Sequence, residues 1–132
     1  MKTIHTAATG AISAARSRDG IYRGAGSYAT FDIGKVLISG GGQLTEGGQS
    51  NVPTKTAVVA NVNGAGTSVG STGSMSVGRR QYNLTILADG SALATGGQSR
   101  VVDSTLVDLD YPVFAAERWD PATRSLDGLV QR

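Results

Sequence analysis

The feature of this 132-residue sequence that most limits its fold is an internal repeat. Residues 28–43 and 82–98 each contain an apolar run, a turn at glycine, a second apolar run, and then a Gly-Gly-Gln ending. Aligning Gly34 with Gly90 also aligns the two Gly-Gly pairs without a gap. Two copies of one supersecondary unit are therefore expected, each unable to bury its apolar surface alone.

Each copy continues beyond a variable loop with a third and a fourth run. In the first copy, residues 56–62 turn at Asn63-Gly64 and resume at residues 67–69. In the second copy, residues 116–119 turn through an Asp-Pro-Ala-Thr segment toward Leu126. Four strands per copy is the count for a propeller blade, and a spacing of roughly 55 to 60 residues is near that of kelch repeats.

The sequence therefore predicts an all-β chain of two consecutive four-stranded antiparallel kelch-type blades, forming a partial propeller. The 19 glycines support strands joined by tight turns, because glycine destabilises helices by about 1 kcal/mol each. The predicted segments are a leader with room for an extra strand, a first blade, and a second blade with a loop insertion. Their bounds are residues 1–25, 26–72 and 73–132, with the insertion at residues 99–113.

Glycine also explains the predicted turns. Asp89-Gly90 and Asn63-Gly64 each lie between apolar runs and are typical of type I′ hairpin turns, which need positive φ at both central residues. The Gly-Gly pairs that end each second strand indicate positive φ or close backbone packing near a propeller axis.

The same glycines do not predict a phosphate site. Residues 64–70 miss the dinucleotide-binding spacing by one residue, and no glycine cluster is followed by Lys-Ser/Thr or by a helical pattern. No helix N-terminus is therefore expected to hold a phosphate.

Composition excludes several other classes. The net charge of +2 comes from scattered residues, and aromatic residues make up 5%, so the basic stripe with aromatics typical of nucleic-acid binding is absent from the sequence. The weakly apolar residues 7–15 are too polar for a secretory signal and too short for a membrane span. We expect a soluble chain without an evident targeting signal.

Residues 78–97 and 116–123 resemble the kelch propellers of galactose oxidase and glyoxal oxidase-like proteins, and residues 34–42 fit the preceding blade of that family. The resemblance covers roughly residues 26–126. It implies a seven-bladed propeller, often secreted, with a copper ion bound by tyrosine and histidine and a tyrosine–cysteine cross-link. Such enzymes oxidise alcohols or aldehydes with O₂ and release hydrogen peroxide.

That copper chemistry does not carry over to the residues of this chain. The sequence has no cysteine, and its single histidine, His5, lies outside both repeats. The family's Arg-x-Tyr motif, anchored on Arg79, places Gln81 where the tyrosine belongs, and Tyr82 one position later. A one-residue shift in a strand points a side chain to the opposite face, so Tyr82 is predicted to pack in the core. We predict no catalytic, cofactor-binding or metal-binding residue.

Three other groups of residues have a functional and a structural interpretation. Asp103, Asp108 and Asp110 lack the spacing of a calcium loop and are expected in a solvated loop, with weak cation binding as the alternative. Asn83 and Thr85 match a glycosylation acceptor, but their position in a strand predicts an inaccessible asparagine. Trp119 is expected to pack between neighbouring sheets, with sugar stacking as the alternative.

Two blades alone leave two sheet faces without a neighbour, because each blade is stabilised by the blades beside it. Three outcomes are open: further blades missing from this sequence, self-association into a ring, or a small sandwich. The favoured function is a non-catalytic scaffold that recognises partners through loops 43–55 and 99–113. The alternatives are a working part of a copper-radical oxidase, whose metal site lies in other blades, and a carbohydrate-binding module.

Overall fold

The computed structural model describes residues 19–42, 52–64, 66–100 and 111–129, together with the backbone of two short strands near the N-terminus. These two strands, β1 (Lys2–Ile4) and β2 (Ile12–Ala14), pair with each other in a separate antiparallel ladder. Within the described residues, no helix is long and apolar enough to span a membrane.

The rest of the fold is two four-stranded antiparallel sheets, each with its strands in sequence order. The first sheet consists of β3 (Ser27–Asp32), β4 (Lys35–Ser39), β5 (Ala57–Asn61) and β6 (Ser68–Thr72). The second consists of β7 (Asn83–Ile86), β8 (Ala92–Thr95), β9 (Glu117–Trp119) and β10 (Leu126–Gly128). The predicted all-β fold with four strands per repeat is confirmed.

The hairpin corners at Gly34 and Gly90 occupy equivalent places, but the turn type at Asp89-Gly90 differs from the prediction. Both glycines have positive φ, 66° and 82°, whereas Asp89 does not. At the second corner the Gly90 N–H donates to the Leu87 carbonyl at 2.9 Å, and the Leu87 N–H donates to the Ser91 carbonyl at 2.8 Å. This is the three-residue hairpin loop that ends in a left-handed glycine, so the predicted type I′ turn is wrong there.

Asn63-Gly64 departs from the prediction in the same way. Gly64 has a φ of 86°, whereas Asn63 is not among the described non-glycine residues with positive φ. The Asn63 side chain instead donates to the Ile33 carbonyl at 2.8 Å and so ties this turn to the neighbouring β3–β4 corner. In both places the turn needs one left-handed residue, and glycine supplies it.

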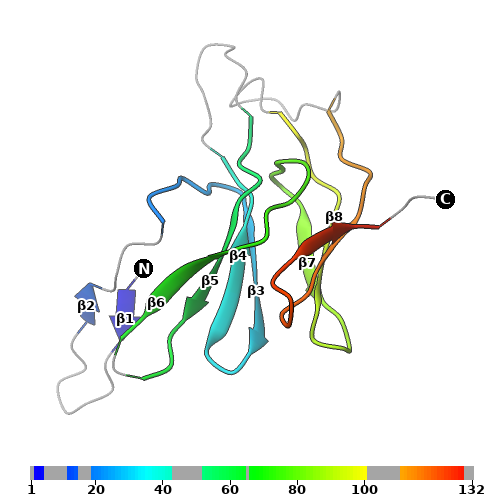
Figure 1. Ribbon diagram of the computed structural model, residues 1–132. Coiled ribbons are helices and arrows are strands. Elements are labelled where there is room, and N and C mark those ends of the chain that lie inside the picture. The colour runs from blue at the N-terminus through cyan, green and yellow to red at the C-terminus, as the bar shows by residue number, and fades with distance from the viewer. Residues whose placement is uncertain are drawn as a thin grey trace, which may run out of the picture.

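The two sheets approach each other most closely where β3 lies beside β7, the first strands of the two repeats. Figure 1 shows the two sheets side by side, and just beyond β6 the Gly73 N–H donates to the Arg124 carbonyl, shortly before β10, at 2.8 Å. Between the sheets lies a core of fully buried apolar side chains, against which Phe31 also packs. Its members are Leu37, Ala57, Val59, Ala92 and Trp119.

Close backbone packing explains the two Gly-Gly pairs, between the repeats at Gly40 and within the second repeat at Gly97. All four glycines have positive φ, from 60° to 92°. The Gly41 N–H donates to the Arg79 carbonyl of the second sheet's leading segment at 2.9 Å. A Cβ on Gly40 would lie 2.5 Å from that same carbonyl oxygen, and a Cβ on Gly97 would lie 2.7 Å from the Arg80 carbonyl oxygen. Both interpretations given for these glycines, positive φ and close packing, hold.

Gly96 and Gly97 make a matched pair for testing this packing. Gly96 has positive φ but open space around a Cβ, whereas Gly97 has positive φ and no room. Gly96→Ala is expected to cost about 1–2 kcal/mol for the left-handed backbone alone. Gly97→Ala should cost about 2 kcal/mol more, because the methyl group collides with the Arg80 backbone. Urea unfolding of both variants measures the difference, and equal costs would contradict the packing argument.

Candidate functional site

A buried arginine precedes the first strand of each sheet and is tied to the turn that follows the second strand. In the second repeat, Arg79 is completely buried. Its Nη1 donates to the Gly96 carbonyl at 3.2 Å and to the Ala115 carbonyl at 3.0 Å, while its Nη2 donates to Glu117 Oε2. Glu117 is also fully buried, and its Oε1 accepts from the Ser76 N–H at 2.6 Å.

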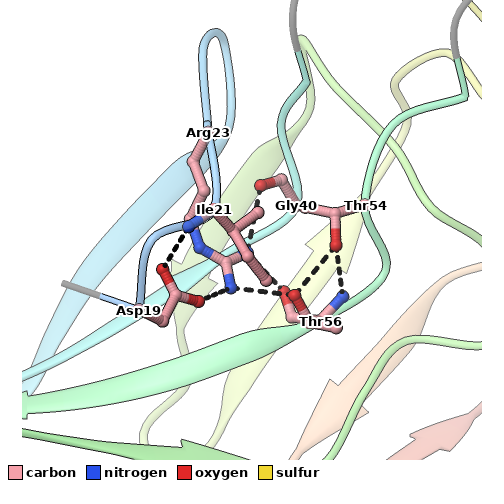
Figure 2. Close-up of polar contacts among 6 residues, drawn as sticks. All are labelled: Asp19, Ile21, Arg23, Gly40, Thr54 and Thr56. Atoms are coloured by element: carbon pink, nitrogen blue, oxygen red, sulfur yellow. Dashed lines mark hydrogen bonds and ion pairs between the residues drawn. The ribbon is translucent and has the colours of Figure 1, made fainter.

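The first repeat builds the same arrangement around Arg23, as Figure 2 shows. Its Nη1 donates to the Gly40 carbonyl at 3.2 Å and to the Thr56 carbonyl at 2.6 Å. Its Nη2 donates to Thr56 Oγ1 at 2.8 Å and to Asp19 Oδ2 at 2.5 Å. Each arginine therefore joins a Gly-Gly turn to the chain entering the third strand.

The two arginines are neutralised by carboxylates from different places. Glu117 lies on β9, in the second sheet itself, whereas Asp19 lies four residues before Arg23 in the chain. Burial acts to raise the pKa of Asp19, but the hydrogen bond and positive charge of Arg23 prevail, so the pKa is lowered. Because a buried guanidinium without a counter-charge is strongly destabilising, the repeat preserves the ion pair but not the position of the acid.

Tyr82 packs in the core, as predicted from the one-residue shift. It is 7% exposed and forms a cluster with Met75 and Ala94. Its hydroxyl forms a hydrogen bond with Ser39 Oγ of the first sheet, and the Arg79 guanidinium lies 5.9 Å from its ring centre. Burial raises the pKa of the Tyr82 hydroxyl, against the opposing effect of the Ser39 hydrogen bond. The hydroxyl is thus a neutral link between the sheets.

Gln81, at the position of the family's tyrosine, is exposed and has a φ of 52°. Ala25, at the equivalent place in the first repeat, has a φ of 51°. The Gln81 N–H donates to the Ala25 carbonyl at 2.8 Å, so these two left-handed residues connect the two repeats directly.

At the hairpin-corner end of the sheets, a groove of about 340 Å³ lies between the two repeats. Its polar side chains include Asp32 and Lys35, which form an exposed ion pair of 2.9 Å. The Lys35 hydrogen bond lowers the pKa of Asp32. The full lining is Phe31, Asp32, Lys35, Val59, Gly90, Trp119, Pro121, Ala122 and Arg124.

Trp119 lines the inner wall of this groove but is only 1% exposed. Its ring meets Phe31 edge-on with the ring centres 4.7 Å apart, and its Nε1 donates to Thr72 Oγ1 at 2.8 Å. The prediction that Trp119 packs between the sheets is confirmed. A ring enclosed in this way offers no open face on which a sugar could stack.

The other residues singled out from the sequence have different outcomes. Asn83 and Thr85 lie on β7 as expected, but both are exposed, so the prediction of an inaccessible asparagine is wrong for this chain.

His5, Asp103, Asp108 and Asp110 lie outside the described residues. Residues 64–70 contain no described helix, and Gly70 lies within β6. No group of three or more His, Cys, Asp or Glu residues lies close enough to hold a metal ion within the described ranges.

Sequence reasoning missed the buried ion pairs. Arg23 was counted only among the scattered charges and Arg79 served only to anchor the Arg-x-Tyr motif, although the two arginines are separated by the same offset as Gly34 and Gly90. Extending the repeat alignment toward the N-terminus would have revealed them. No such signal identifies Asp19 or Glu117, because the acids are not at equivalent positions.

Comparison with known proteins places this fold among larger β-rich proteins. No family model matches the chain, and no curated protein sequence matches it either. A solved structure described as a novel fungal alcohol oxidase of the AA5 family, in complex with copper, superposes with a TM-score of 0.79 at 23% identity. The match covers 96% of this chain and 26% of that chain.

A second solved structure, of YjhT, superposes with a TM-score of 0.58 at 14% identity and covers 86% of this chain and 29% of its own. The chain therefore spans roughly a quarter to a third of these structures. At these identities the likeness shows the fold alone.

The buried Arg79–Glu117 pair should contribute far more to stability than the partly hydrated Arg23–Asp19 pair. Glu117→Gln leaves a buried guanidinium without a counter-charge and is expected to cost about 3–5 kcal/mol in urea unfolding. Asp19→Asn should cost less, because the Asp19 side chain is 18% exposed. Equal losses in Glu117→Gln and Asp19→Asn would contradict this interpretation.

Asp89 should make stability depend on acidity at the second hairpin corner. Hydrogen bonds from the Ser91 side chain and backbone, followed by Arg118, lower the pKa of Asp89 from 3.8 to about 2. The stabilising effect is present above the unfolded pKa and is lost as the pH falls from about 4 to about 2. In urea titrations the parent chain should lose more stability over this interval than Asp89→Asn. Parallel pH curves for the two chains would contradict the assignment.

Proposed function

We propose that this chain is a pair of consecutive kelch-type blades, residues 26–72 and 73–132, that acts as a non-catalytic scaffold of galactose oxidase-like architecture. The observation that carries the proposal is the repeated set of backbone positions. Arg23, Ala25 and Gly41 recur as Arg79, Gln81 and Gly97. Ala25, Gln81 and the two glycines are all left-handed, and each arginine donates to the first glycine of its Gly-Gly pair, Gly40 or Gly96. A unit repeated in this detail is typical of propeller blades stacked around one axis.

The scaffold holds its two longest loops at equivalent places. The Thr54 N–H donates to the Gly41 carbonyl at 2.8 Å, and the Val113 N–H donates to the Gly97 carbonyl at 2.9 Å. These bonds anchor the ends of the proposed recognition loops, residues 43–55 and 99–113. Of these loops, residues 43–51 and 101–110 lie outside the described part of the chain. Binding residues are commonly carried by loops on a rigid framework, which supports a recognition role here.

A second candidate function is a working part of a copper-dependent alcohol oxidase. The observation in its favour is the superposition of nearly the whole chain on the copper-containing fungal alcohol oxidase. The donor set of this chain does not fit the copper site that the resemblance implies. There is no cysteine, His5 is the sole histidine, and the Tyr82 hydroxyl is engaged with Ser39. On this proposal, the metal ligands come from outside this sequence, and we derive no catalytic step here.

Peroxide release distinguishes the two functions. The purified chain is incubated with Cu²⁺ and with primary alcohols, aldehydes and galactose, and peroxide is measured with a coupled peroxidase. The scaffold proposal predicts no peroxide above that of copper alone, and no change when Tyr82 is replaced by Phe. Turnover that requires the chain and is lost in Tyr82→Phe would overturn the scaffold proposal.

A further inference from the structure

Each of the two sheets has one face that packs against the other sheet and one face that points away from it. In the first sheet, Val36 and Ile38 point away from the second sheet, because they flank the core residue Leu37, and Tyr28 lies on the same face because it pairs with Ile38. Tyr28 is 75% exposed, and Val36 and Ile38 are partly exposed, whereas their strand neighbours Ala60 and Val58 on the same face are buried. We call this the leading face.

The leading face is equivalent, through the repeat, to a surface that is already covered. The offset that aligns Gly34 with Gly90 places Tyr28 on Leu84, Val36 on Ala92 and Ile38 on Ala94. Leu84, Ala92 and Ala94 all pack in the core between the sheets. The leading face therefore has the apolar character and the strand positions of a surface made to receive another sheet of the same kind.

The outer side of the second sheet supplies the complementary surface. Thr85, Leu93 and Arg118 stand side by side on three neighbouring strands, facing away from the core. Thr85 and Leu93 are the repeat equivalents of Ala29 and Leu37, and Arg118 stands where the first sheet has Val59. We call this the trailing face. Its leucine and threonine methyl groups offer apolar contact. The Arg118 guanidinium donates hydrogen bonds to Ser91 Oγ and Asp89 Oδ2.

Backbone groups are positioned for the same contact. Within the chain, Gly41 N–H donates to Arg79 O, and Gln81 N–H donates to Ala25 O. In a contact of the same kind between two copies, the equivalent bonds would run from Gly97 N–H to the carbonyl of the next copy's Arg23, and from that copy's Ala25 N–H to Gln81 O. Within the described residues, neither the Gly97 N–H nor the Ala25 N–H donates to a backbone carbonyl.

From this continuity with the internal contact, we propose that the trailing face of one copy binds the leading face of a second copy, in a head-to-tail assembly. The inference rests on the proposed pairing of two blades. A head-to-tail contact generates a ring when its rotation closes. Because propellers close with four to eight blades, rings of two to four copies are expected.

The test measures mass in solution and uses one variant for each face. The parent chain should show two to four times the chain mass in light scattering after size exclusion. Tyr28→Lys on the leading face and Thr85→Glu on the trailing face should each reduce this to the mass of one chain. Mixing the two variants should restore a 1:1 complex, because each retains the face that the other lacks. Ile33→Lys, at an 85% exposed corner position outside both faces, is the matched control and should assemble like the parent.

Each outcome decides the proposal. A monomeric parent overturns it, as does assembly that survives Tyr28→Lys or a variant mixture that stays monomeric. Thr30→Lys is a second variant of the leading face in case Tyr28→Lys does not fold, as judged by circular dichroism. The peroxide assay is a separate readout, so failure of self-assembly is distinguishable from failure of the scaffold function.

Discussion

The contact on which the structure depends is the approach of one Gly-Gly turn to the backbone of the following repeat. Gly41 donates directly to the Arg79 carbonyl, and a Cβ on Gly40 would collide with the same oxygen. Main chains can come this close only where neither residue carries a side chain between them. The distance between the sheets at β3 and β7 follows from this contact, and the apolar core fills the space between the two sheets.

The buried arginines stabilise this close approach of the two main chains. Left-handed glycines turn their carbonyl groups away from regular strand pairing, and buried carbonyls need donors. Arg23 and Arg79 each supply several donors in a fixed planar geometry, one of which reaches the first glycine of the pair. A carboxylate then balances each guanidinium. The repeated element is therefore an arginine, a glycine turn and an acid, of which only the first two keep their places in the sequence.

This construction bears on function through what it holds in place. The ends of two long loops are fixed at the Gly-Gly turns, while the hairpin corners and the groove lie at the other end of the sheets. The aromatic residues that sequence reasoning offered for chemistry, Tyr82 and Trp119, join the sheets to each other instead. The described residues thus form a frame, and the proposed recognition role belongs to the loops attached to it.

The sequence alone determined the fold class, the number of strands per repeat, and the equivalence of Gly34 and Gly90. It could do so because strand alternation and glycine turns are local signals that need no knowledge of distant residues. Tyr82 and Trp119 were also placed correctly in the core, Tyr82 from strand parity and Trp119 from the resemblance to a kelch blade.

Only the tertiary structure decided the turn types, the exposure of Asn83 and the partners of the buried arginines. Turn type depends on φ at Asp89 and Asn63, which neighbouring strands and side chains set together. The exposure of Asn83 depends on whether another sheet covers β7. Asp19 and Glu117 reach equivalent arginines from unrelated sequence positions, because a buried charge requires a counter-charge nearby in space, whatever its place along the chain.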